Sequence, residues 1–199
     1  EPFTHHVISC FTADGDVAKT GSELVMIEAE DQSLKVGKYP GAHQGGAMRF
    51  GADGKLYATI GEHNTREPAQ SFESLHGKLL RLNPDGSLDP SFQPAPDTII
   101  LCMAIQPDGK IVVGGPCSNV NGQPINSLAR LNTNGTLDTT FAAPFVVSYP
   151  IAIAVQPDGK LLVGGQYTGI GGVVGLTPRA NVARLNADGT VDPPFNPGA

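Results

Sequence analysis

The sequence predicts an all-β fold: a β-propeller-type array of four-stranded blades, about three and a half blades long. The first observation is a phrase that recurs with a period of about 50 residues, a spacing typical of propeller repeats. It reads MAIQPDGKIVVGG at 103–115, IAVQPDGKLLVGG at 153–165 and, less closely, MRFGADGKLYATIG at 48–61. A second phrase follows each copy, as LLRLNPDGSLDPSF (79–92), LARLNTNGTLDTTF (128–141) and VARLNADGTVDPPF (182–195).

Composition supports this fold class. The 199 residues include 25 Gly and 17 Pro but no Trp, which suits short strands joined by tight turns and argues against a helical bundle. No apolar run approaches about 18 residues, so no transmembrane helix is predicted. The net charge is −6, and Lys and Arg are not clustered. Binding to a nucleic-acid backbone is therefore excluded, because phosphate contacts need concentrated positive charge.

The hairpins are marked by Asp-Gly and Asn-Gly pairs between apolar runs, from Asp14-Gly15 to Asp188-Gly189. These residues tolerate the positive φ that tight turns require. The arms 103–105 and 111–113 are dense in apolar residues, which predicts strands buried on both faces. The Gly114-Gly115 pair that follows predicts close backbone approach rather than a nucleotide loop, since no Gly-Lys-Ser/Thr follows it.

The repeats divide the chain into four parts. We expect a half blade and crossing strand over 1–45, a first blade over 46–97, a second over 98–150 and a third over 151–199. The segment 166–179 is longer than its counterpart 116–127, which indicates a loop insertion. The chain begins without Met and without a signal-peptide pattern, so we expect a mature form or an internal piece of a longer protein.

Two residue types recur at fixed positions of the second phrase. Arginine stands in each Arg-Leu-Asn step, and phenylalanine ends each phrase. We expect each arginine to lie along a neighbouring strand or to pair with an acid of its repeat; the alternative is an anion-binding ring of three arginines. We expect each phenylalanine to plug the space between adjacent units. The residues are Arg81, Arg130 and Arg184, with Phe92, Phe141 and Phe195.

The three cysteines, Cys10, Cys102 and Cys117, contain no CxxC motif. Cys102 and Cys117 are predicted on opposite arms of one hairpin, so a disulfide and a pair of small buried apolar side chains are both open. The histidines His63 and His76 have no metal-ligand spacing, so no metal site is predicted for them.

Residues 5–90 resemble the glucose/sorbosone dehydrogenase family, six-bladed propellers that oxidise sugars with pyrroloquinoline quinone (PQQ). The matching segments are HHVISCFTADGD, SELVMIE, AQSFESLHGKLLRLNPDGS and above all HQGGAMRFGADGKLYATIGEHN (43–64). The resemblance implies that His43 is a general base on the anomeric hydroxyl of the sugar. Glu62, where the family more usually has Asp, would orient it, and such a pair is sound acid–base chemistry. It also implies Ca²⁺ on oxygen ligands, for which no Asp-rich loop is visible.

Residues 98–198 resemble a different family, the delta-60 (DUF5122-type) β-propeller repeats, through QPDGKIVVGG and ARLNTNGTLDTTF. This resemblance implies large bacterial surface or secreted proteins without a known catalytic role. The tail of the first unit, RLNPDGSLDPSF, fits the same pattern, so the two resemblances overlap near 80–92. Both imply a periplasmic or extracellular location.

Two functions therefore compete. The favoured one is a non-catalytic extracytoplasmic scaffold or interaction module without a cofactor. Its partner would be a protein or further propeller blades, because an open arc exposes strand edges and a stable propeller typically needs about four to eight blades. The alternative is part of a PQQ- and calcium-dependent aldose dehydrogenase with a sugar ligand.

Convergence of cations near His43 would favour the enzyme, and the nearest in sequence are Arg49, Arg66, Lys78 and Arg81. A mixed origin, in which a dehydrogenase blade is reused as the first repeat of a surface protein, is the favoured account.

Overall fold

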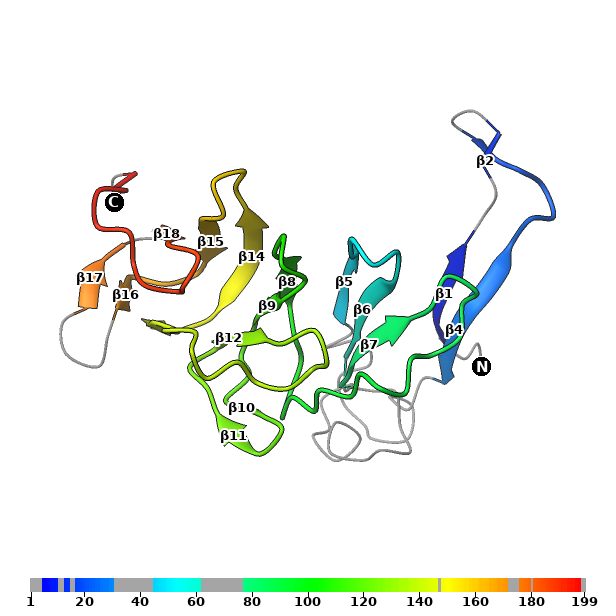
Figure 1. Ribbon diagram of the computed structural model, residues 1–199, viewed down its shortest axis with the longest axis horizontal. Helices are drawn as coiled ribbons and strands as arrows, with labels where there is room; N and C mark the ends of the chain where they lie inside the picture. The colour runs from blue at the N-terminus through cyan, green and yellow to red at the C-terminus, as the bar shows by residue number, and fades with distance from the viewer. Residues whose placement is uncertain are drawn as a thin grey trace.

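The computed structural model describes residues 5–10, 13–14, 17–30, 45–61, 77–146, 148–171, 176–179 and 181–197. These ranges are all β, and their sheets follow one another in an arc from the N-terminal hairpin to the C-terminus (Figure 1). None of them forms a helix that could span a membrane. The strands are β1 (His5–Cys10), β2 (Ala13–Asp14), β3 (Val17–Ala18), β4 (Leu24–Glu30), β5 (Gly45–Phe50), β6 (Leu56–Ile60), β7 (Leu79–Leu82), β8 (Cys102–Ile105), β9 (Ile111–Gly114), β10 (Asn119–Val120), β11 (Gln123–Pro124), β12 (Leu128–Leu131), β13 (Phe145–Val146), β14 (Pro150–Val155), β15 (Leu161–Gly165), β16 (Gly169–Gly171), β17 (Leu176–Pro178) and β18 (Val182–Leu185).

Three antiparallel sheets form the body of the array. We call them the first sheet (β5-β6-β7), the second sheet (β8-β9-β12) and the third sheet (β14-β15-β18). In each, the first phrase supplies two strands and the second phrase supplies the third. Strand β8 contacts β5 on one side and β14 on the other, so these three strands lie next to each other along the array. The propeller-type fold class is thereby confirmed for the described residues.

The fourth strand of each blade is reduced to a single bridge. The pairs are Leu82 with Leu88, Leu131 with Leu137 and Leu185 with Val191. The acid that follows each bridge ends the pairing. In the second unit, for example, Asp138 Oδ1 accepts hydrogen bonds from the backbone N–H and the hydroxyl of Thr140, which turns the chain.

Apolar side chains pack between successive sheets. One cluster joins the first and second sheets, with Leu79 and Phe92 against Val113 and Leu131. Another joins the second and third sheets and includes Val112. Strand β9 is buried at every position, which confirms the prediction that its residues face neighbours on both sides.

The hairpin turns follow the Asx-Gly pairs. In each described first or second phrase, the Asp or Asn side chain accepts the backbone N–H two residues on, as Asn134 does from Thr136. The glycine then takes a positive φ, which is 86° at Gly135 and 94° at Gly189. The sequence prediction of these turns is confirmed.

Short outer hairpins extend the units. β10 pairs with β11 in the second unit. The longer segment 166–179 forms β16 and β17, and β16 pairs with both β17 and β13. At the N-terminal end, the segment predicted as a hairpin followed by a separate strand forms one long hairpin instead. β1 pairs with β4 and β2 with β3, because the strand Leu24–Glu30 supplies the second arm.

The Gly-Gly pairs do bring backbones close together. A Cβ on Gly115 would lie 2.6 Å from the carbonyl oxygen of Ile99, and one on Gly165 would lie 2.5 Å from that of Tyr149. A Cβ on Gly114 would meet Pro150, the first residue of β14 in the next sheet. These positions therefore need glycine for packing, as the sequence predicted.

Gly189→Ala should destabilise the chain more than Gly159→Ala. Both glycines have a positive φ, so both variants carry the same backbone strain. A Cβ on Gly189 would also lie 2.7 Å from the Phe141 ring, whereas one on Gly159 meets only Ala187 at 3.8 Å. We expect a difference of about 1–3 kcal/mol in the free energy of unfolding, measured by urea titration. Equal losses would mean that the Phe141–Gly189 contact contributes nothing.

Candidate functional site

Each unit holds one carboxylate between a lysine and an arginine, a group that we call the Lys-Asp-Arg cluster. In the second unit, Asp138 Oδ2 accepts Lys110 Nζ at 2.8 Å and Arg130 Nε at 2.8 Å. In the third unit, Asp192 Oδ2 accepts Lys160 Nζ at 2.9 Å and Arg184 Nε at 2.7 Å.

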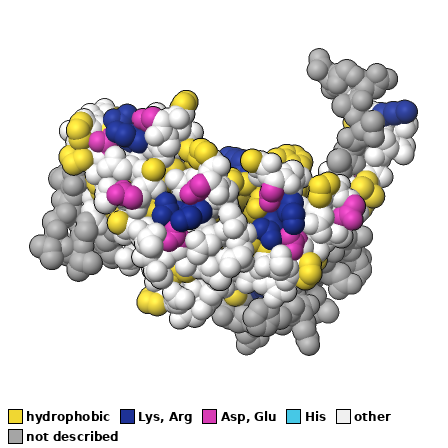
Figure 2. Space-filling model, viewed as in Figure 1, with side chains coloured by type: hydrophobic (Ala, Val, Ile, Leu, Met, Phe, Trp, Pro, Cys, Tyr) yellow, Lys and Arg dark blue, Asp and Glu magenta, His cyan; other side chains and the backbone are white. Residues whose placement is uncertain are grey.

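The first unit repeats this arrangement. Asp89 accepts Lys55 and Arg81, and Ser91 donates to its other oxygen, as Thr140 does to Asp138. In the third unit Pro194 stands at that position and offers neither an N–H nor a hydroxyl. Figure 2 shows charged side chains gathered at three places along one face, in line with the three units.

The predicted pairing of each arginine with an acid of its own repeat is confirmed, and the three arginines belong to three separate clusters rather than to one anion-binding ring. Sequence reasoning had missed the lysines. The signal was present, because a lysine follows the Asp-Gly turn in every copy of the first phrase.

The arginine of each cluster also stacks on the phenylalanine that ends its phrase. The guanidinium carbon lies 4.6 Å from the ring centre of Phe92 in the first unit, 4.7 Å from that of Phe141 in the second and 4.6 Å from that of Phe195 in the third. Such cation–π contacts contribute about 0.5–2 kcal/mol each, depending on burial.

The same arginines reach into the next unit. Arg81 donates to the carbonyl of Thr133, and Arg130 donates to the carbonyl of Ala187 at 2.8 Å. Both carbonyls belong to hairpin turns of the following unit. The ring of Phe141 packs on the glycine of the same turn, Gly189, which confirms the expected role of this phenylalanine between units. The cluster therefore adds polar contacts between neighbouring sheets to the apolar packing that also joins them.

The carboxylates of these clusters are held ionised. Hydrogen bonds from Lys55 and Ser91 lower the pKa of Asp89 well below its usual range. Burial opposes ionisation of Asp138, but hydrogen bonds from Lys110, Thr140 and Arg130 outweigh it and also lower its pKa. A carboxylate held in this state near neutral pH serves structure rather than proton transfer.

A groove of about 350 Å³ lies where the three sheets meet along β5, β8 and β14. Residues 47–49, 101–103 and 151–153 line it, and Arg49 is the one charged residue among them. PQQ carries several carboxylates, so the described lining of this groove, with Arg49 as its one cation, does not fit the group by itself. The described residues also contain no group of three or more His, Cys, Asp or Glu that could hold a metal ion.

The residues predicted as an acid–base pair, His43 and Glu62, lie outside the described residues, as does Arg66. The nearest described residues belong to paired strands: Gly45, at the start of β5, pairs with Ile60, at the end of β6. Of the other cations nearest to His43 in the sequence, Arg81 is bound in its cluster and Lys78 is buried. Among the described ones, Arg49 lines the groove.

Cys102 and Cys117 are both free and buried. They belong to different apolar clusters, and the thiol of Cys117 donates to Asp97 and to the carbonyl of Asn119. Burial raises the pKa of each thiol to about 12. Of the two alternatives in the sequence, the structure shows small buried side chains rather than a disulfide.

With this geometry established, two families account for most of the chain. Residues 8–98 match the model of the Glucose / Sorbosone dehydrogenase family. Residues 106–141 and 156–195 match that of a β-propeller domain of unknown function, DUF5122. The expected resemblances are confirmed, and they describe a glucose/sorbosone dehydrogenase-like segment followed by two repeats of another kind.

Individual proteins and solved structures are also similar to this chain. Aldose sugar dehydrogenase YliI of Escherichia coli (strain K12) is 42% identical over 85 residues, which is 37% of this chain and 23% of that protein. A crystal structure of a glucose dehydrogenase covers 94% of this chain with a TM-score of 0.55 and 19% identity, and 62% of that structure is covered. The PQQ-bound aldose sugar dehydrogenase from Streptomyces coelicolor covers 90% of this chain with a TM-score of 0.46 and 20% identity, and 58% of it is covered. The chain thus spans less than a quarter of the curated enzyme.

Asp138→Asn should lower the free energy of unfolding by about 2–3 kcal/mol, because it leaves Lys110 and Arg130 without their buried counter-charge. Asp108→Asn is the matched control. Asp108 caps an exposed turn by accepting the N–H of Lys110, which an asparagine can also do. We expect this control to change stability by less than about 0.5 kcal/mol in urea titrations.

The pH dependence of stability should follow the same carboxylates. Their pKa values are lower in the folded chain than in the unfolded one, so their contribution is complete above the unfolded pKa of about 4 and is lost as the pH falls below it. Asp138→Asn should therefore flatten the fall in stability on the acidic side, and an unchanged slope would contradict the assignment.

In a Cys10→Ser variant, Cys102 and Cys117 should resist iodoacetamide at pH 8. Only the thiolate reacts, and burial both raises the thiol pKa to about 12 and blocks access. Mass spectrometry should show both sites labelled after unfolding in urea. Rapid labelling of the folded chain would contradict the burial of these thiols.

Proposed function

We propose that this array is a scaffold or interaction module of a larger extracytoplasmic protein, built by reusing a dehydrogenase-like blade as its first repeat. The single observation that carries the proposal is the use of the Lys-Asp-Arg clusters. Asp138 binds Lys110 and Arg130, and Arg130 also donates to Gln106 of its own unit and to the carbonyl of Ala187 in the next unit. The charged groups that recur with the repeat thus serve to join sheets.

The match of the second half to DUF5122 supports the same function. A dehydrogenase of the resembled family would draw cofactor ligands from blades beyond the first. In this chain the corresponding positions follow another repeat pattern, and the described groove offers one cation, Arg49, to a polycarboxylate quinone. A location in the periplasm or outside the cell is part of the proposal and comes from both resemblances.

A second candidate function is part of a PQQ- and calcium-dependent aldose dehydrogenase. It is favoured by the 42% identity over 85 residues to the aldose sugar dehydrogenase. The described strands β5 and β6, which lie between His43 and Glu62 in the sequence, form the hairpin that the resembled segment predicts. In this function His43 would take the proton of the anomeric hydroxyl of the sugar, and Glu62 would orient the imidazole.

The two functions are separated by an assay of dye-linked aldose oxidation after incubation with PQQ and Ca²⁺. For the scaffold we expect no activity and no heat of PQQ binding in calorimetry. Wild type, His43→Ala and the control His76→Ala should behave alike. Oxidation that is lost in His43→Ala but kept in His76→Ala would establish the dehydrogenase and overturn the scaffold.

A further inference from the structure

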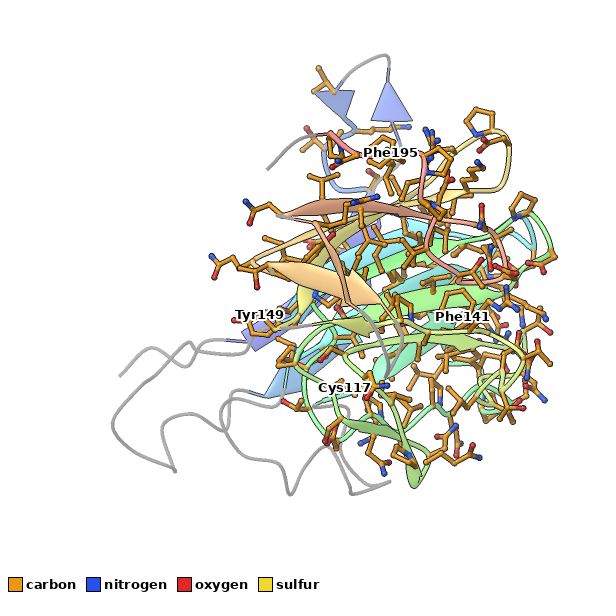
Figure 3. The ribbon with its side chains drawn as sticks, turned by 90° about the vertical axis from the view of Figure 1, so that its left-hand side faces the viewer. Cys117, Phe141, Tyr149 and Phe195 are labelled. Atoms are coloured by element: carbon orange, nitrogen blue, oxygen red, sulfur yellow. The ribbon has the colours of Figure 1, made fainter. Side chains whose placement is uncertain are left out.

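The third sheet differs from the second because only one of its faces is covered. Strands β9 and β12 are buried at every position, whereas buried residues alternate with more exposed ones in β15 and β18. Val182 is 38% exposed, while Leu128, at the same position of the second sheet, is 0% exposed. We call the side that carries Leu162, Val182, Arg184 and Phe195 the outer face of the third sheet. Figure 3 views the array from this end and labels Phe195 and Phe141.

The polar groups of the outer face are also incompletely used. The Arg184 side chain is 25% exposed, against 9% for Arg130. Among the described residues Arg184 pairs with Asp192 but makes no counterpart of the bond from Arg130 to a carbonyl of the next unit. Gln156 Oε1 is buried without a hydrogen-bond partner in the described part of the chain. Its counterpart, Gln106 Oε1, accepts from Arg130 at 3.3 Å.

Two interfaces inside the chain show what such a face binds. The first unit gives Arg81 to the carbonyl of Thr133, and the second gives Arg130 to the carbonyl of Ala187. The glycine two residues after each carbonyl packs on the phenylalanine of the preceding unit: Gly135 on Phe92 and Gly189 on Phe141. In the second interface the N–H of Ala142 also donates to the carbonyl of Asp188 at 2.8 Å.

We propose that the outer face of the third sheet binds one further repeat of the same kind. That repeat would carry an Arg-Leu-Asn-X-Asx-Gly turn, whose X carbonyl accepts Arg184 and whose glycine seats Phe195. The inference rests on the proposed function, because it names the partner of the interaction module. It extends an interface that the chain already forms twice with the same atoms.

A second copy of this chain fits the face less well. Each of the second and third sheets packs on the preceding sheet with one side, which we call its docking side. The first sheet of a second copy would have to bind with the corresponding side. That side carries Leu56, Ala58, Leu80 and Leu82, all of which are buried already. A repeat with an uncovered docking side is therefore the occupant that the structure favours.

The experiment uses an extended chain in which a copy of residues 142–195 follows Phe195. The last phenylalanine of the copy is changed to leucine, so that Phe195 is read alone. Hydroxyl-radical footprinting should show oxidation of Phe195 falling to the level of Phe141 in the extended chain. Phe50, which is 75% exposed on β5, should be oxidised equally in both chains. Unchanged oxidation of Phe195 would overturn the proposal.

Arg184→Ala in both chains gives an independent measurement. The ion pair with Asp192 exists in both, so its loss cancels in the comparison. The fall in Tm should be larger in the extended chain and should approach that of Arg130→Ala. Equal falls in the two chains would overturn the proposal.

Sedimentation of the unextended chain over a range of concentrations tests whether a second copy of the chain binds the outer face. Self-association that protects Phe195 as concentration rises would make a second copy the partner and would also overturn the proposal. A failure here is distinct from a failure of the scaffold function, which is decided by His43-dependent aldose oxidation. A Phe195 that stays exposed in the extended chain, together with no His43-dependent oxidation, would overturn this inference alone.

Discussion

The structure depends on one buried carboxylate in each unit. A largely buried carboxylate must be matched by cations and hydrogen bonds, and Asp138 obtains them from a lysine of the first phrase and an arginine of the second. Because the lysine and the carboxylate come from different phrases, their ion pair fixes the position of one phrase relative to the other. The arginine, once held, lies over the phenylalanine and points to the next turn. A local requirement for charge compensation thereby sets the geometry between units.

Much of the fold could be predicted from the sequence because its determinants are local. The Asx-Gly turns, the doubly buried strands and the pairing of arginine with an acid of the same repeat all follow from residues a few positions apart. The lysine was missed because its partner is distant along the chain: Lys110 and Asp138 are 28 residues apart. The fourth strand was overestimated because the turn that Asp138 makes with Thr140 ends the pairing after one bridge.

The candidate catalytic pair was predicted from a family pattern rather than from physical determinants. A segment such as 43–64 can specify a hairpin by itself, and the described β5 and β6 confirm that hairpin. A sugar-oxidising site needs groups from several blades at fixed distances, which no single segment encodes. After the first unit the chain matches a different repeat family, and no described residue tests the pair, so His43 and Glu62 remain a prediction.

The interface between the first and second units has an evolutionary consequence. Here a dehydrogenase-like unit meets a repeat of a different family, yet Arg81 and Phe92 engage Thr133 and Gly135 just as Arg130 and Phe141 engage the third unit. The arginine binds a main-chain carbonyl and the phenylalanine packs on a glycine. These two contacts do not require particular side chains elsewhere in the neighbouring unit. Units whose remaining sequences differ can therefore be joined at this interface, provided that the upstream unit carries the arginine and the phenylalanine.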